Sequence, residues 1–235
     1  MVAPLGARPV ASLDESTRST FIIRVYQHLF AAIVAFVAFE VLLFNLGIAE
    51  AIWDLVSGSS GAWLLVLGGF MVVSWLATSA ANDILNPSRQ YLGLFGLAAA
   101  EALIFAPFLY YFFNVRPSGD ADVWAAAVIT GFGFAGLTAV AFTTRRDLSF
   151  IRPLMIWGGV CALVLIAAAL LFGFELGIWF SVAMIGLAGA SILYQTQTII
   201  RRYPSEAYVG ASVQLFASVM LLFWYVLRLL GQVRS

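Results

Sequence analysis

Three charged residues lie inside long apolar stretches of this sequence, namely Glu40, Glu101 and Arg228. A charge inside a bilayer is costly, so such residues usually face a partner, a water-filled cavity or an ion path. Glu101 lies in the middle of its stretch and Glu40 in the outer half of another, and either carboxylate could carry a proton or bind a cation. The alternative is that each is neutral or paired and only holds neighbouring helices together. Arg228 lies near the end of the last stretch, where extension of its side chain to the membrane surface explains it.

Polar residues recur at helical spacing in the last two apolar stretches. In the final one, steps of four, three, four and three place on one helix face Gln214, Ser218, Leu221, Tyr225 and Arg228. The preceding one has a similar face with Ser181, Met184, Ala188, Ser191, Gln195 and Thr198. Two such faces can form a hydrogen-bonded seam, which is the commoner arrangement, or line a narrow polar path. The candidate residues of a cation pathway or gate are Glu101, Glu40, Gln195, Gln214, Ser218, Ser191, Tyr225 and Arg228.

Missing residue types exclude several classes of membrane protein. The chain has no lysine, so it cannot form the Schiff base that holds retinal. No Asp lies in an apolar stretch, which excludes an intramembrane protease with two catalytic aspartates. One Cys (Cys161) and one His (His28) can form neither an internal disulfide nor a zinc site of four Cys and His ligands. A Ser-His hydrolase would depend on His28 alone, so the sequence predicts no enzyme, no metal site and no cofactor.

The composition is that of a membrane protein. Of the 235 residues, 63% are hydrophobic and 10% charged, and the mean hydropathy is +0.98, whereas soluble domains are about half apolar and a quarter charged. Twelve arginines balance twelve acidic residues, so no basic patch is available and a nucleic-acid partner is excluded. The first twenty residues lack the apolar stretch of a signal peptide, so we expect the first span itself to direct insertion and the N-terminus to be retained.

Seven stretches reach the length of about 20 residues that a helix needs to cross a bilayer. They cover residues 29–47, 62–81, 91–113, 123–142, 153–172, 177–199 and 209–230. The predicted fold class is therefore an all-α integral membrane protein with seven transmembrane helices. Residues 1–28 form a polar N-terminal cytoplasmic tail, 29–230 a single transmembrane domain and 231–235 a C-terminal tail. The N-terminal tail is either a docking segment for a partner or a disordered leader, and its polar composition favours the leader.

The distribution of arginine predicts the orientation, because basic residues in short loops stay in the cytoplasm. With the N-terminus inside, nine arginines lie on the cytoplasmic side, and only Arg116 and Arg234 lie outside. The C-terminus is then outside. Arginine without lysine, beside abundant alanine and glycine, suggests a GC-rich bacterial genome. We therefore expect the bacterial inner (plasma) membrane as the location and the lipid bilayer as a partner.

Three segments of the chain resemble the Bax inhibitor-1 family of transmembrane proteins. ILYQTQTIIRRYPSEAYVGASVQLFASVMLLFWYVLRLLG, from Ile192 to Gly231, resembles the last two helices of that family. TGFGFAGLTAVAFTTRRDLSF, from Thr130, resembles its fourth helix and the loop that follows, and FIIRVYQHLFAAIVAF, from Phe21, the entry into its first helix. The resemblance is to bacterial YccA-like members in particular, and it implies six helices around a central, polar seventh.

The resemblance implies two alternative functions. Bacterial relatives are pH-sensitive calcium leaks with an Asp in each of the last two helices and an Arg in the second. The matching positions here are Gln195 and Ser218, which cannot share a titrating proton as two carboxylates do, and the second span has no basic residue. The first alternative is therefore a calcium leak with weak or altered pH gating. The YQTQ stretch at 194–197 favours the second, a YccA-like, non-transporting modulator whose partner is a membrane-anchored ATP-dependent protease.

Overall fold

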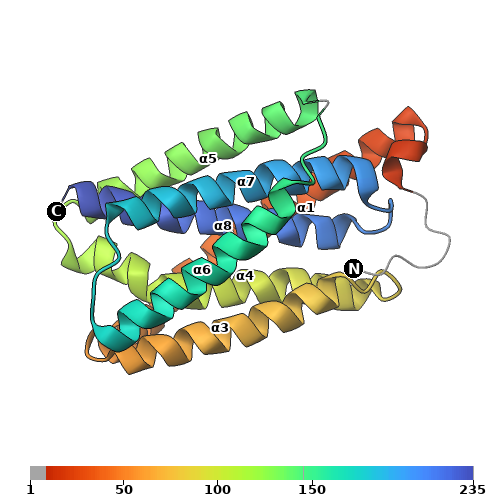
Figure 1. The fold of residues 1–235 in the computed structure, drawn as a ribbon. Coiled ribbons are helices and arrows are strands. Elements are labelled where there is room, and N and C mark those ends of the chain that lie inside the picture. Colours follow the sequence, from red (N-terminus) through yellow and green to blue (C-terminus); the bar gives the residue numbers. More distant parts are fainter. Residues whose placement is uncertain (1–8, 145, 235) are drawn as a thin grey trace.

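The computed structural model describes residues 9–144 and 146–234, with the exception of the side chain of Ser60. The helices are α1 (Glu15–Asn45), α2 (Ile48–Ser57), α3 (Ser60–Ala81), α4 (Pro87–Tyr110), α5 (Gly119–Thr143), α6 (Ile151–Phe172), α7 (Ile178–Arg202) and α8 (Tyr208–Val233). A 3-10 turn (Val10–Ser12) precedes α1, and a π-helical turn (Tyr111–Val115) extends α4 beyond Pro107. Every helix except α2 is long and apolar enough to cross a membrane. The predicted all-α fold with seven spans is therefore confirmed for the described residues (Figure 1).

Helix α1 begins well before the first predicted span. The Asp14 carboxylate caps it by accepting hydrogen bonds from the backbone N–H of Thr17 at 3.0 Å and from the Ser16 hydroxyl. Before the helix, Val10 is buried and its N–H donates to the carbonyl of Tyr203 at 2.8 Å. Pro9 and Val10 thus lie against the loop between α7 and α8, and residues 15–28 are part of α1, so the disordered leader that composition favoured is wrong for residues 9–28. Residues 1–8 lie outside the described part of the chain.

Helices α4 and α8 share the centre of the bundle. The apolar window of α4 is 67% buried and that of α8 56% buried, whereas no other span exceeds 28%. Helix α8 packs against α1, α3, α4, α5 and α7. Helix α6 crosses the front of the bundle in Figure 1, and the helices it packs closely against are α7 and α3. The predicted central seventh helix is therefore present, and α4 lies beside it.

Helices α3 and α4 approach each other closely at Gly93 of α4. A methyl group there would collide with the backbone of α3 at Ala77 and Ala81, so only glycine allows this contact. Gly131 of α5 and Gly186 of α7 make no such contact, because a Cβ atom added at either position would meet nothing within 4 Å.

The loop between the first two spans contains the short helix α2. Gly47 allows the turn that leads into it, since its φ of 71° lies in the left-handed region. Ala49 and Val56 of α2 are buried, and the Trp53 ring lies 5.4 Å from that of Tyr111, between centroids. Helix α2 thus covers the end of α4, and its ten residues are too few to cross a bilayer.

The two ends of the bundle differ in charge. The starts of α1, α4, α6 and α8 and the ends of α3, α5 and α7 lie together at one end, which we call the arginine-rich end. Its described arginines are Arg18, Arg24, Arg89, Arg146, Arg152, Arg201 and Arg202. The far end has α2, the π-helical turn and the loop before α7, with Arg116, Arg228 and Arg234.

Candidate functional site

The two predicted polar faces meet between α7 and α8. The Ser218 hydroxyl of α8 donates to Oε1 of Gln195 on α7 at 2.9 Å, and Ser218 is buried. Nearer the far end, the Ser181 hydroxyl donates to Oε1 of Gln232 at 2.8 Å. Gln195 and Ser218, at the positions where the resemblance implies two aspartates, therefore contact each other through a hydrogen bond between uncharged side chains.

Three other polar residues of the two faces, Ser191, Tyr225 and Gln214, contact groups close to them. Ser191 donates to the carbonyl of Leu187 in its own helix at 3.0 Å, as membrane serines often do. The ring of Tyr225 packs edge-on against Phe180, with centroids 5.8 Å apart. Gln214 lies beside the hydroxyl of Tyr203, where burial raises the pKa of that tyrosine to about 12. Between α7 and α8, side-chain hydrogen bonds thus join Ser218 to Gln195 and Ser181 to Gln232.

Arg228 stabilises the loop that precedes α7. Its Nη2 donates to the carbonyl of Leu176 at 2.9 Å, and Nε2 of Gln232 donates to the same carbonyl at 3.0 Å. The guanidinium also lies over the ring of Phe180, 5.8 Å from its centroid. The half-buried Arg228 therefore binds a backbone carbonyl at the far end of the bundle.

Glu101 faces the centre of the bundle from α4. It precedes Phe105 and Phe108 by four and seven residues and so shares their helix face. Phe105 packs edge-on against Trp224 of α8 at 4.8 Å, and Phe108 stacks on the same ring at 4.4 Å. Glu101 is 6% exposed. Within the described residues, its carboxylate has no hydrogen-bond or ion-pair partner.

Glu40 faces α4 from the other side of this interface. It lies between Phe36 and Phe44 on one face of α1, and these rings contact Phe105 at 5.3 Å and Phe113 at 6.0 Å. Both carboxylate oxygens of Glu40 are buried, and neither has a hydrogen-bond partner among the described residues. An ionised carboxylate is expensive to bury without a partner, so each of these two groups needs a proton or a cation.

Comparison with known proteins decides the family. The family model described as "Inhibitor of apoptosis-promoting Bax1" matches residues 18–235, nearly the whole chain. The chain belongs to the Bax inhibitor-1 family. It is similar to Bax inhibitor 1 of Schizosaccharomyces pombe, with 27% identity over 240 residues that cover 97% of this chain and 82% of the yeast protein.

Bacterial proteins are similar to it as well. An uncharacterized protein of Pseudomonas aeruginosa is 28% identical over 170 residues, which cover 71% of this chain and 73% of that protein. An uncharacterized membrane protein of Vibrio cholerae is 28% identical over 127 residues, covering 51% and 54% of the two chains. The predicted resemblance to Bax inhibitor-1 proteins is therefore confirmed, and the family match includes most of α1.

In this Bax inhibitor-1 family member, His28 joins α1 to α4 and α8. Its Nδ1 lies 2.7 Å from the carbonyl of Arg24, to which it donates, and its Nε2 accepts from the hydroxyl of Tyr91 at 3.1 Å. The ring also lies 5.0 Å from that of Tyr208. Both ring nitrogens are thus engaged by groups other than a serine hydroxyl, which a Ser-His hydrolase would require.

Sequence reasoning missed an ion-pair cluster at the far end. Asp122 is 2% exposed and pairs with Arg116 at 3.3 Å and with Arg234 at 2.6 Å. Asp122 directly precedes a predicted span and therefore resembled an ordinary surface charge. Its spacing of six residues from Arg116 was a local signal, but no local signal points to Arg234, which is 112 residues away.

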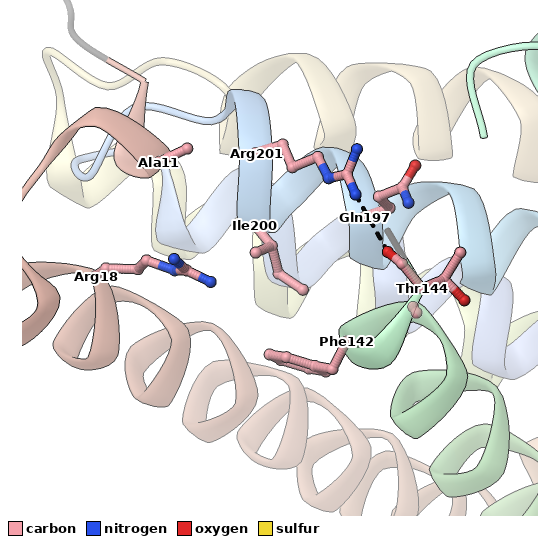
Figure 2. A pocket seen from close by; sticks show the side chains of 8 residues that line it. Ala11, Arg18, Phe142, Thr144, Gln197, Ile200 and Arg201 are labelled. Carbon is pink, nitrogen blue, oxygen red and sulfur yellow. Dashed lines mark hydrogen bonds between the residues drawn. The ribbon is translucent and has the colours of Figure 1, made fainter. Parts of the chain in front are cut away.

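Gln197 is a second residue that sequence reasoning did not single out. Its Oε1 accepts from the N–H of Leu148 at 2.8 Å, and its Nε2 donates to the carbonyl of Arg146 at 2.6 Å. Gln197 therefore fixes the loop after α5 to the end of α7. This contact forms one wall of a pocket of about 380 Å³ at the arginine-rich end (Figure 2).

Proposed function

We propose that the protein is a cation leak that passes calcium across a bacterial inner membrane, with its N-terminus in the cytoplasm and no enzymatic activity. The observation that supports this most is the pair of buried carboxylates, Glu40 and Glu101, in the interface between α1, α4 and α8. Calcium prefers oxygen ligands, and carboxylates within a membrane commonly mark ion paths. A proton or a calcium ion can satisfy the same buried carboxylate, so occupancy by one excludes the other.

The depth of Glu101 supports a path beside α8. Ser218 precedes Trp224 by six residues, which is a rise of about 9 Å along α8. Glu101 precedes Phe105 and Phe108, the two residues packed on Trp224, by a rise of about 6 to 10 Å along α4. Helices α4 and α8 run in the same direction, since Gly210 lies beside Asn82 and Gly231 beside Phe112. Glu101 and Ser218 therefore lie at similar depth in the bundle, Glu101 on the α4 side of α8 and Ser218 with Gln195 on its α7 side. In this proposal Ser218 and Gln195 line the path on the α7 side. Gln214 and Tyr225 continue the proposed path on either side, whereas Ser191 and Arg228 bind backbone carbonyls.

The contact between α7 and α8 does not make the proposed calcium flux depend on pH. Gln195 and Ser218 form a neutral hydrogen bond and do not titrate. Any pH dependence of flux then comes from Glu101 or Glu40. The proposed leak thus differs from one that is gated by an acidic pair.

The test is calcium entry into proteoliposomes that contain the purified protein, measured beside protein-free vesicles at about pH 6 and about pH 8, on either side of neutral pH. We expect entry above that of empty vesicles, and a change of at least severalfold in Glu101→Gln and Glu40→Gln. Glu206→Gln is the matched control, because Glu206 is exposed in the loop before α8. Entry equal to that of empty vesicles would rule out the leak.

A second candidate function is modulation of a membrane-anchored ATP-dependent protease. The observation that favours it is the folded start of α1, which presents an exposed polar face with Glu15 and Ser19 at the arginine-rich end. In the proposed orientation this face is cytoplasmic and accessible to a protein partner. Affinity purification from native membranes, with wild type, Glu15→Arg and the control Glu206→Arg, tests it. Recovery of no protease with the wild type contradicts this function.

A further inference from the structure

The pocket at the arginine-rich end lies between the start of α1 and the ends of α5 and α7 (Figure 2). Arg18 extends from α1 toward it, and Arg201 extends from α7 on the opposite side. Nη2 of Arg201 donates to the carbonyl of Thr144 at 3.1 Å, which fixes that guanidinium at the end of α5. Two arginines thus line one space, and no acidic residue lines it.

The charge of Arg18 is not neutralised within the described protein. Elsewhere at this end Arg89 pairs with Asp83 at 3.1 Å and Arg202 with Asp147 at 3.4 Å. Arg18 is exposed and forms no ion pair with a described carboxylate. Guanidinium groups bind phosphate through paired, charge-assisted hydrogen bonds. The pocket therefore suits an anion of phosphate type.

Apart from Gln197 and Thr144, the rest of the pocket lining is apolar. Ala141, Phe142 and Ile200 line it, and the Phe142 side chain is 44% exposed. The pocket lies where α5 and α7 leave the apolar region, and Arg18 lies about one turn before the apolar residues of α1 begin at Phe21. A ligand that fits this arrangement has an anionic head and an apolar body.

We propose that this pocket binds the phosphate group of an anionic phospholipid from the leaflet at the arginine-rich end. Arg18 and Arg201 hold the phosphate, and an acyl chain lies on Phe142. Helix α1 packs on α4 and α8, whereas α5 and α7 pack on each other and on α8. A lipid bound here therefore links α1 to α5 and α7. The proposal is independent of whether the protein conducts cations.

The test is thermal unfolding of the delipidated full-length protein in neutral detergent, titrated with phosphatidylglycerol, phosphatidylcholine or inorganic phosphate. We expect phosphatidylglycerol to raise the unfolding temperature in a saturable way and phosphatidylcholine to have little effect. Loss of one charge-assisted contact in Arg18→Gln weakens the apparent affinity for phosphatidylglycerol about tenfold or more. Arg152→Gln is the matched control, because Arg152 is exposed at the same end and lies outside the pocket lining.

Each outcome of this titration is decisive. The phospholipid site is supported if Arg18→Gln weakens the effect of phosphatidylglycerol while Arg152→Gln binds as the wild type does. Equal affinity in the two variants, or no saturable effect on the wild type, overturns it. If inorganic phosphate stabilises the wild type as strongly as the lipid and with the same dependence on Arg18, the ligand is a soluble phosphate and the phospholipid proposal is wrong. Equal unfolding temperatures of the unliganded variants show that Arg18→Gln folds.

Discussion

Ser218 on α8 donates a hydrogen bond of 2.9 Å to the side-chain oxygen of Gln195 on α7. The two residues are 23 positions apart in the chain and come together because α7 and α8 pack along most of their length. Carboxylates at these positions would be close enough to share one proton. The chemical nature of this one contact therefore determines whether the α7–α8 interface responds to pH.

Replacing both residues by aspartate introduces a titrating pair. In Gln195→Asp with Ser218→Asp we expect calcium entry into proteoliposomes to become dependent on pH between about 6 and 8, because close carboxylates cannot both be ionised without a large cost. The control is Ser191→Asp, which adds one carboxylate to α7 at a residue that bonds to its own helix. A double variant whose flux shows the same pH profile as the wild type contradicts a gating role for this contact.

The seven spans and the polar faces were predictable because they depend on local sequence. Apolar length and the 3.6-residue period are visible within one helix, so both were found before any contact was known. The meeting of Ser218 with Gln195 also followed from the period of two consecutive helices. The start of α1 had a local signal too, since Asp14 followed by Glu15 is typical of a helix N-terminus. A search for apolar windows ignores that signal and places the start of the first span at residue 29.

The long-range contacts were not predictable from the sequence. Nothing in the sequence around Asp122 points to Arg234, and the packing of Gly93 on α3 depends on the relative positions of two helices. The surroundings of Glu40 and Glu101 likewise depend on how α1, α4 and α8 pack. The sequence identified these carboxylates as costly to bury, but only the fold places both in one interface.

The cluster around Asp122 should contribute strongly to stability. Asp122→Asn leaves Arg116 and Arg234 without their carboxylate, and loss of one partner of a buried ion pair costs about 3 kcal/mol or more. The Arg116 side chain is 11% exposed and the Arg234 side chain 54% exposed, so water compensates Arg116 less for the loss of its carboxylate partner. We expect a fall of several degrees in the unfolding temperature, measured in detergent. Asp120→Asn, at an exposed position two residues away, should leave it within about 1 °C, since exposed charges contribute little.

The N-terminal cap of α1 should lose its effect in acid. Hydrogen bonds from Ser16 and Thr17 lower the pKa of Asp14 from its ordinary value of 3.8 to about 2. Because the pKa in the folded state lies below the unfolded value, the stabilisation is complete above about pH 4 and disappears as the pH falls toward 2. The difference in unfolding temperature between wild type and Asp14→Ala should therefore be constant above about pH 4 and should decrease toward zero at lower pH. A difference that persists unchanged at pH 2 would show that the ionised carboxylate is not the cap.

The proposed orientation predicts which loops a membrane-impermeant maleimide can reach from outside the cell. In a Cys161→Ser background, Ser118→Cys places a thiol at the far end of the bundle, and Ser149→Cys places one at the arginine-rich end. Both positions are exposed. Because arginines in short loops remain in the cytoplasm, we expect labelling of the first variant in intact cells and of the second only after the membrane is opened. The reverse pattern would place the start of α1 and the Arg18 pocket on the outer side, and would then assign the proposed phospholipid to the outer leaflet.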